Sequence, residues 1–166
     1  IDSVGFGMYD KDFRTKSLSK LSEKSIIYKD DIEDWEIYEE LLKHYLEPFL
    51  IQPSIIIDYP IELQHVAEID ESKQIAKRFS FVVKGIEVCD GGVKFPNSSK
   101  YRIVYDENAE YRKNKMGIID NDSPEEYYKD IDFYSKNVFT FGFGVDRLFA
   151  ICKDKRINEI VFFPFH

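Results

Sequence analysis

Two glycines and an arginine near the carboxyl-terminal end of the chain could bind an anionic group. Gly142 and Gly144 follow an apolar run that begins at Phe139, and an amphipathic helix is expected to open at Asp146 and Arg147. Because glycine has no Cβ, the backbone at both positions can approach another molecule closely. A complete dinucleotide fingerprint is excluded, because its third glycine falls at Arg147. The rigid, permanently charged fork of Arg147 suits a phosphate or a carboxylate, although a structural ion pair is the alternative.

A second group of chemically capable residues follows a predicted β-hairpin. Phe79–Val83 and Ile86–Cys89 are alternating runs, and Lys84-Gly85 between them is a tight-turn signal. Glu87 lies within the second strand, shortly before Asp90-Gly91-Gly92. An acidic residue in the middle of a strand is unusual for simple core packing. It indicates either a functional carboxylate or a structural carboxylate whose hydrogen bonds are satisfied.

The segment from Gly142 to Arg147 resembles motif 3 of the class II aminoacyl-tRNA synthetases. Ile157–Pro164 resembles the strand ending in Phe-Pro that follows this motif in the aspartyl, asparaginyl and lysyl branch. The resemblance implies that Arg147 is a catalytic residue that holds the γ-phosphate of ATP. It also implies that Gly142 and Gly144 lie against the bound nucleotide.

The strand of Glu87 is similar to a segment of the archaeal-type aspartyl and asparaginyl enzymes. By this resemblance Glu87 and Asp90 hold Mg²⁺ against the phosphates of ATP, and their hard oxygen atoms suit that ion. Gly91 and Gly92 would make room for the amino acid. Lys94 replaces the arginine that holds the side-chain carboxylate or amide of the substrate, so this chain departs from the family pattern there.

Two further residues resemble parts of the same active site. Glu62 follows a run that looks like a family strand whose glutamate shapes the active-site floor; a core strand with a polar exit loop is the alternative. Phe13-Arg14 is similar to the Phe-Arg of motif 2, in which the arginine binds the α-phosphate. Lys16 stands where motif 2 has a glutamate, and a solvated basic loop is the alternative for Arg14.

The remaining segments predict the elements that must position these residues. A helix is expected from Asp30 or Asp31 to about Glu47, because apolar residues recur three and four apart and Pro48 follows. The other expected elements are a strand within 1–13, a polar loop over 10–24, a short strand over 24–28, a buried strand over 55–63, a short strand over 101–105 within an exposed insertion of about 95–122, and a helix from a capping box at Ser123 to about Ser135.

The composition limits the classes of protein and partner. With 166 residues, 43% of them hydrophobic, the chain can bury one core, and we expect a single domain over 1–166. A formal net charge of -8 argues against unaided nucleic-acid binding. No apolar run reaches membrane-spanning length. The two cysteines favour a reducing, cytoplasmic compartment. The three histidines are scattered and lack the spacing of metal ligands. The start at Ile1 suggests a piece of a longer protein.

The resemblance implies an α+β fold, with an antiparallel β-sheet flanked by helices, as the C-terminal part of a class II synthetase catalytic core. The implied function is ATP-dependent amino-acid activation within an aminoacyl-tRNA ligase of the aspartate, asparagine or lysine type. The expected cofactors are ATP and Mg²⁺. The expected partners are an amino acid, tRNA only through regions outside this chain, and a second copy or a partner chain; no membrane is expected.

Two alternatives remain open. One is a divergent synthetase paralogue that binds ATP or a partner without tRNA ligase activity. The other is a synthetase-like ligase that acts on a target other than tRNA. Because nothing in the chain matches motif 1, we expect the isolated chain to be weakly active or inactive.

Overall fold

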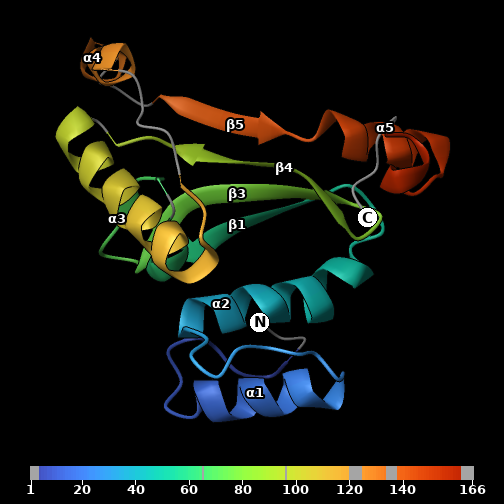
Figure 1. The fold of residues 1–166 in the computed structure, drawn as a ribbon. Coiled ribbons are helices and arrows are strands. Elements are labelled where there is room, and N and C mark those ends of the chain that lie inside the picture. The colour runs from blue at the N-terminus through green and yellow to red at the C-terminus, as the bar shows by residue number, and fades with distance from the viewer. Residues whose placement is uncertain (1–3, 65, 96, 120–124, 134–137, 162–166) are drawn as a thin grey trace. The chain divides into compact units, whose positions relative to one another are not determined.

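The computed structural model describes residues 4–64, 66–95, 97–119, 125–133 and 138–161 (Figure 1). The strands are β1 (Ser54–Pro60), β2 (Ile69–Asp70), β3 (Ile75–Val83), β4 (Ile86–Val93) and β5 (Phe139–Phe143). The α-helices are α1 (Phe13–Glu23), α2 (Asp34–Leu41), α3 (Ser98–Met116), α4 (Glu125–Phe133) and α5 (Val145–Lys153). Short turns of other helix types are η1 (Leu42–Leu46), η2 (Glu47–Phe49), η3 (Ile61–Leu63) and η4 (Ile157–Glu159).

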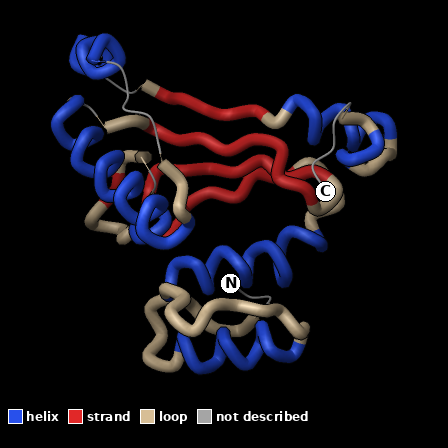
Figure 2. The backbone as a smooth tube through the Cα atoms, viewed as in Figure 1, coloured by secondary structure: helices blue, strands red, loops and turns tan. Residues whose placement is uncertain are grey.

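The strands form one sheet in the order β1-β3-β4-β5, and the short β2 pairs with β3 (Figure 2). The pairings of β2 with β3 and of β4 with β5 are antiparallel. Lys84 and Gly85, at φ angles of 50° and 74°, form the tight turn that joins β3 to β4, as predicted. The predicted α+β fold, an antiparallel sheet with flanking helices, is confirmed.

The chain divides into two compact units, and each is built from separate segments of the sequence. The first comprises residues 1–55, 81–88 and 144–166, and the second comprises residues 56–80 and 89–143. The single domain expected over 1–166 stays a prediction. Each unit is described by itself below.

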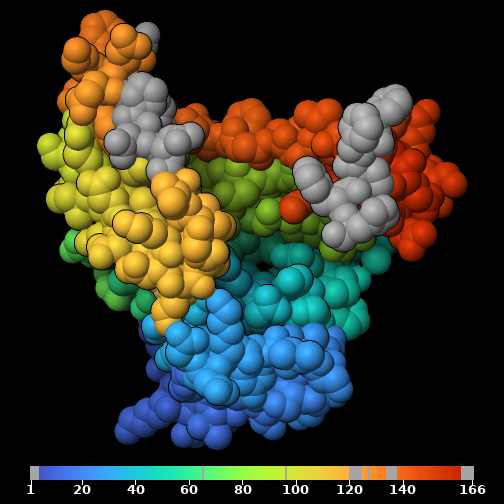
Figure 3. Space-filling model, viewed as in Figure 1, coloured from blue at the N-terminus to red at the C-terminus, as the bar shows by residue number. Residues whose placement is uncertain are grey.

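The core of the first unit lies between α1 and α2, which form one packed layer at the blue end of the chain (Figure 3). Phe13, Ser17 and Leu21 recur every four residues and are buried, so they share one face of α1. Helix α1 replaces most of the loop expected over 10–24, which is wrong, and the strand expected within 1–13 is wrong for residues 4–12, which form turns and loops; residues 1–3 lie outside the described residues. Helix α1 was not predicted because the polar Ser17 lies in the middle of its buried face and interrupts the apolar periodicity.

The short strand expected over 24–28 is also wrong. Ser25 adopts a φ of 55° directly after α1, and the backbone N–H of Ile26 donates to the carbonyl of Leu21. The chain reverses direction there, and the side chain of Ile27 is 97% exposed. An apolar run without a pairing partner does not form a strand.

The long helix of the first unit ends where the sequence predicts but begins later. Glu33 and Glu36 form a capping box at the start of α2, which displaces the start expected at Asp30 or Asp31. The helical path continues through the π-type turn η1 to Leu46. The 3₁₀ turn η2 contains Pro48, so the predicted end of the helix near Glu47 is confirmed.

Strand β1 forms as expected, but it is not buried. Ile55 and Ile57 are 63% and 61% exposed, whereas Tyr59 and Pro60 at its end are buried. Ile55 and Ile57 are two residues apart, so they lie on one face of the strand, and that face is exposed.

Helix α3 replaces the short strand expected over 101–105, which is wrong. The side chain of Asn97 accepts a hydrogen bond from the backbone N–H of Lys100, and Gly117 ends the helix at a φ of 68°. Tyr101 is its buried residue, and it packs with Phe95 and with Tyr128 of α4 in the core of the second unit.

The predicted helix near 123–135 is confirmed over Glu125–Phe133, whereas Ser123 of its expected capping box lies outside the described residues. The segment expected as a strand over 157–164 forms the 3₁₀ turn η4 at its start, and residues 162–164 lie outside the described residues. The described helices include none that is both long and apolar enough to span a membrane.

Candidate functional site

The start of α5, in the first unit, holds Arg147 in a fixed position against the Glu87–Val88 part of β4. Gly144 is the N-cap of α5, and its backbone N–H donates to the carbonyl of Val88 at 2.8 Å. The Nη1 of Arg147 donates to the carbonyl oxygen of Glu87 at 2.8 Å and lies 3.7 Å from the carboxylate Oε1 of the same residue. The Arg147 side chain is nevertheless 52% exposed, and within the described residues no hydrogen bond engages its Nη2.

A carboxylate that sequence reasoning missed, Glu47, lies in the electrostatic environment of this arginine. Burial raises the pKa of Glu47, the negative charge of Glu87 raises it further, and Lys43 and Arg147 lower it. Two carboxylates that disfavour each other's charge suit a neighbouring cation. The described residues contain no group of three or more histidine, cysteine or acidic side chains able to hold a metal ion. Binding of Mg²⁺ by these residues would therefore need oxygen atoms from a ligand as well.

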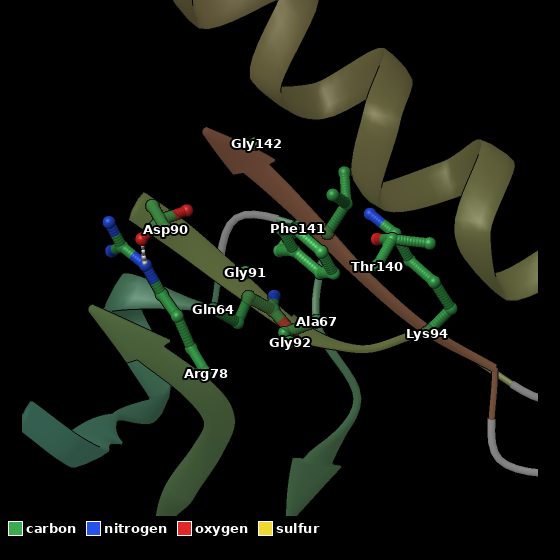
Figure 4. A pocket seen from close by; sticks show the side chains of 11 residues that line it. Gln64, Ala67, Arg78, Asp90, Gly91, Gly92, Lys94, Thr140, Phe141 and Gly142 are labelled. Carbon is green, nitrogen blue, oxygen red and sulfur yellow. Dashed lines mark hydrogen bonds and ion pairs between the residues drawn. The ribbon is translucent and has the colours of Figure 1, made fainter. Parts of the chain in front are cut away.

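The second unit contains a cavity of about 140 Å³ between β3, β4, β5 and the chain after η3 (Figure 4). It brings together most of the residues that the sequence assigned to the amino acid. The lining residues that carry the argument are Arg78, Asp90, Gly91, Gly92, Lys94 and Gly142. Asp90 and Gly142 are directly opposite each other in the pairing of β4 with β5.

Asp90 is bound to groups of its own unit. Its Oδ2 accepts a hydrogen bond from Nε of Arg78 at 2.8 Å and lies 3.3 Å from the hydroxyl of Ser80. The hydroxyl of Tyr59 donates to Ser80 Oγ at 2.8 Å. Arg78 is only 10% exposed and its guanidinium lies 4.6 Å from the ring centre of Tyr59. Arg78 therefore balances the charge of Asp90 and orients it in the cavity.

Lys94 lies on the other side of the cavity, after the end of β4 (Figure 4). Its Nζ is 5.3 Å from the ring centre of Tyr101, and within the described residues it forms no salt bridge or hydrogen bond. Burial lowers the pKa of the Lys94 ammonium, and the charge of Asp90 opposes this shift. A half-buried ammonium without an ion-pair partner is a group that an anionic ligand would stabilise.

The glycines differ in why the fold needs them. A Cβ at Gly91 would lie 2.4 Å from the carbonyl oxygen of Thr140, and one at Gly92 would lie 2.7 Å from that of Lys77. A Cβ at Gly144 would lie 3.2 Å from Cδ of Arg147. Gly91 and Gly92 are thus required by close contacts with the backbone, whereas at Gly144 the neighbouring atoms belong to the flexible side chain of Arg147. A Cβ at Gly142 would meet no atom nearer than 3.9 Å, so the chain itself does not require glycine there.

Two predicted site residues, Arg14 and Glu62, belong neither to the surroundings of Arg147 nor to the lining of the cavity. Arg14 on α1 donates through Nη1 to Oδ1 of Asp34 at 2.6 Å and through Nη2 to the carbonyl of Ile32 at 2.8 Å, which ties α1 to the start of α2. Glu62 lies on η3 and is exposed. It does not line the cavity, whereas Gln64 two residues later does. Their proposed contacts with ATP and with the amino acid remain predictions.

Arg78, Tyr59 and Ser80 were not predicted as site residues. The signal was present in part, because the alternation of the Phe79 strand extends back to Ile75 and turns Arg78 and Ser80 to one face. An arginine inside an apolar alternating run indicates a buried partner carboxylate. Glu47 had no such signal, since it lies at the end of a helix.

Residues 8–166 match the family of class II tRNA synthetases that includes the D, K and N enzymes. The chain is 26% identical to a lysine–tRNA ligase of Campylobacter jejuni, in an alignment covering 96% of this chain and 32% of that protein. It is 25% identical to a lysine–tRNA ligase of Helicobacter pylori, with 99% of this chain and 32% of that protein covered.

A lysine–tRNA ligase of Buchnera aphidicola is 29% identical over 78% of this chain and 26% of its own length. The chain thus spans about a third of the length of the curated relatives that it matches.

Proposed function

Because the chain belongs to the class II tRNA synthetases of the D, K and N type, we propose that it contributes to ATP-dependent amino-acid activation within an aminoacyl-tRNA ligase. The observation that carries the proposal is Arg147. Its guanidinium is tied by Nη1 to the backbone of β4, and half of the side chain remains exposed. Such an arginine is positioned before a phosphate arrives, so little conformational entropy is lost on binding.

In the proposed reaction the carboxylate of an amino acid attacks the α-phosphate of ATP, and pyrophosphate leaves. The attacking group is already ionised, so no general base is needed. Positioning and charge neutralisation supply the rate enhancement. Arg147 would hold the γ-phosphate, Glu87 and Asp90 would contribute oxygen atoms to Mg²⁺, and Arg14 would contact the α-phosphate. Gly142, where a Cβ would meet open space, would let the nucleotide approach β5.

The amino acid would occupy the cavity of the second unit, with Gly91 and Gly92 at its wall and Lys94 at its side-chain end. The acidic chain offers no basic stripe for tRNA, which would bind through regions outside it. A second copy or a partner chain would complete the active site. The free cysteines Cys89 and Cys152 favour the cytoplasm as its compartment.

A paralogue that binds ATP without tRNA ligase activity is the second candidate. The observation that favours it is Arg14, which is engaged by Asp34 and by a backbone carbonyl and is thus committed to the packing of α1. A synthetase-like ligase that uses another acceptor is a third candidate, because the chain contains no tRNA-binding signature. Both retain the phosphate site at Arg147.

The test is calorimetric titration of the purified chain with ATP and Mg²⁺. Arg147→Ala is expected to weaken binding by about 1.5–3 kcal/mol, the typical value of a charge-assisted hydrogen bond. Arg156→Ala is a matched control, since Arg156 is also exposed and pairs with Glu159 on η4. Equal ATP affinity of Arg147→Ala and the unmodified chain would refute the phosphate site. Amino-acid-dependent pyrophosphate exchange then separates a ligase from a nucleotide-binding paralogue.

A further inference from the structure

A groove in the second unit lies between the first turns of α3 and the chain around β2. Its volume is about 530 Å³, which is large enough to take up part of a partner molecule. Its apolar lining consists of Ile69 on β2, Phe95, and Ile103 and Val104 on α3. The side chain of Ile103 is 58% exposed although it lies well inside the helix. The groove therefore offers apolar surface that the described part of the second unit leaves open.

Most of the carboxylates around this groove already have a partner. Oε2 of Glu68 accepts a hydrogen bond from Nζ of Lys77 at 2.8 Å, so the charges of this pair offset each other. Oδ1 of Asp70 accepts hydrogen bonds from the backbone N–H and the hydroxyl of Ser72, at 3.1 and 2.6 Å. Its Oδ2 lies 4.0 Å from Nζ of Lys73. Neither carboxylate needs a further cation.

Two charged side chains at the rim of the groove form no ion pair with the described residues, namely Glu71 and Lys100. Both side chains are exposed. Lys100 can keep its ammonium in water while its methylene groups border the groove. Glu71 has a shorter side chain and follows β2 directly, so its carboxylate stays close to the apolar lining. The groove thus suits a segment that presents apolar side chains beside a cation.

The carboxyl-terminal end of α3 and the residues after it carry this complementary chemistry. Met116, Ile118 and Ile119 are 53%, 47% and 81% exposed. Lys113 is exposed and forms no ion pair within the described part of the chain. Residues 113–119, called the basic-apolar segment below, therefore match the groove in both apolar surface and charge.

The basic-apolar segment cannot enter the groove of its own chain. Helix α3 is continuous over Ser98–Met116, so Met116 lies about 20 Å beyond Ile103 along the axis, at about 1.5 Å per residue. The backbone N–H of Ile118 donates to the carbonyl of Arg112, which holds the residues after the helix against its last turn. The segment of a second copy has no such restriction, because an antiparallel α3 brings its carboxyl-terminal end beside the first turns of this one.

We propose that two copies of this chain associate by placing the basic-apolar segment of each in the groove of the other. Lys113 of one copy pairs with Glu71 of the other, and Ile118 and Ile119 cover the apolar lining. One two-fold axis across the middle of α3 makes both contacts at once, as a self-complementary dimer requires. The association is independent of the function proposed above, because none of these residues is assigned to ATP or to the amino acid.

Sedimentation equilibrium of the purified chain, from about 1 µM to about 500 µM, tests this association. A reducing agent excludes a disulfide through the exposed Cys152. We expect a reversible equilibrium between monomer and dimer. Glu71→Lys and Lys113→Glu should each raise the dimer Kd at least tenfold, because like charges then meet at both contacts.

An equimolar mixture of Glu71→Lys and Lys113→Glu provides the sharpest readout. Each variant alone should be mostly monomeric at concentrations where the unmodified chain is a dimer. The mixture should form a dimer with a Kd within about threefold of the unmodified chain, since both contacts of the mixed dimer then join a lysine to a glutamate. A surface outside the two contacts would not produce this recovery.

The apolar part of the contact is tested by Ile119→Glu, which should also raise the dimer Kd at least tenfold. The side chain of Ile119 is 81% exposed, so the fold should be retained, and circular dichroism checks this. The matched control is Ile27→Glu, which makes the same change at a side chain in the first unit that is 97% exposed. It should leave the dimer Kd unchanged within twofold.

A chain that stays monomeric over the whole concentration range would overturn the proposal. A dimer that Glu71→Lys and Ile119→Glu leave intact would also overturn it, because another surface would then form the contact. Two single variants that stay monomeric when mixed would contradict the reciprocal exchange of segments.

Discussion

Two arginines, Arg78 and Arg147, each lie beside a carboxylate, and they differ in how much of the guanidinium group remains accessible to a ligand. Arg78 is 10% exposed and donates to Asp90 and to the carbonyl of Leu63. Arg147 is 52% exposed and uses one terminal nitrogen on the backbone of Glu87. The buried Arg78 balances the charge of Asp90 within its own unit. The exposed Arg147 is held by Nη1, and among the described residues its Nη2 makes no hydrogen bond. Burial, more than the presence of an ion pair, thus separates the structural arginine from the one that we propose binds a ligand.

Replacing each arginine by alanine should lower the free energy of unfolding by very different amounts. Arg78→Ala leaves Asp90 without its partner and the face of Tyr59 uncovered, so we expect a loss of about 3 kcal/mol in the free energy of unfolding. Arg147→Ala should cost less than about 1 kcal/mol, because its pair is exposed. Urea denaturation of both variants measures this difference. Similar losses in the two would show that Arg147 is structural.

The glycines sharpen the same distinction within β4 and β5. Gly91→Ala should destabilise the chain by about 1–3 kcal/mol, because the new Cβ would lie 2.4 Å from the carbonyl oxygen of Thr140. Gly142→Ala should change stability by less than about 0.5 kcal/mol and yet weaken nucleotide binding, because its Cβ would occupy open space beside β5. Thermal unfolding and ATP titration of both variants provide the check. Unaltered nucleotide affinity in Gly142→Ala would remove Gly142 from the proposed site.

The smallest expected effect is the pH dependence at Glu47. Its pKa is raised in the folded chain, chiefly by burial, so the folded state binds more protons than the unfolded state just above the ordinary value of 4.5. The contribution of Glu47 to stability therefore falls as pH rises through that window. Glu47→Gln should flatten this fall, because the amide that replaces the carboxyl group does not titrate.

Chemical denaturation of Glu47→Gln and the unmodified chain between pH 4 and pH 7 tests this expectation. Glu23→Gln serves as the control, because Glu23 is an exposed carboxylate on α1 paired with Lys20. An unchanged pH profile in Glu47→Gln would show that burial does not perturb this group.

The sequence predicts those parts of the fold whose conformation is set by neighbouring residues, and it misses elements that lack an apolar periodicity. The hairpin at Lys84-Gly85 and the corner at Gly144 were predictable, because backbone conformations there are set by adjacent residues. Helix α3 was missed because a single residue, Tyr101, anchors it, so no apolar periodicity shows. Its only local signals were the caps, Asn97 and Gly117.

The candidate site was predictable where it resembles a known motif and not where it depends on pairing between strands. Gly91, Lys94 and Gly142 were assigned from such resemblance, and they meet at one cavity. The pairing of Arg78 with Asp90 was missed because the expected strand began at Phe79, whereas β3 begins at Ile75 and includes Arg78.

The edge strand β1 has a consequence for handling the molecule. Ile55 and Ile57 present apolar surface on a strand at the end of the sheet, the kind of segment that nucleates intermolecular pairing in concentrated solution. Asp58, between them and Tyr59, is exposed and has a φ of 59°. Its charge and its left-handed backbone interrupt the flat edge that a second chain would need. In a screen for soluble expression, position 58 should therefore accept asparagine or glycine and reject valine.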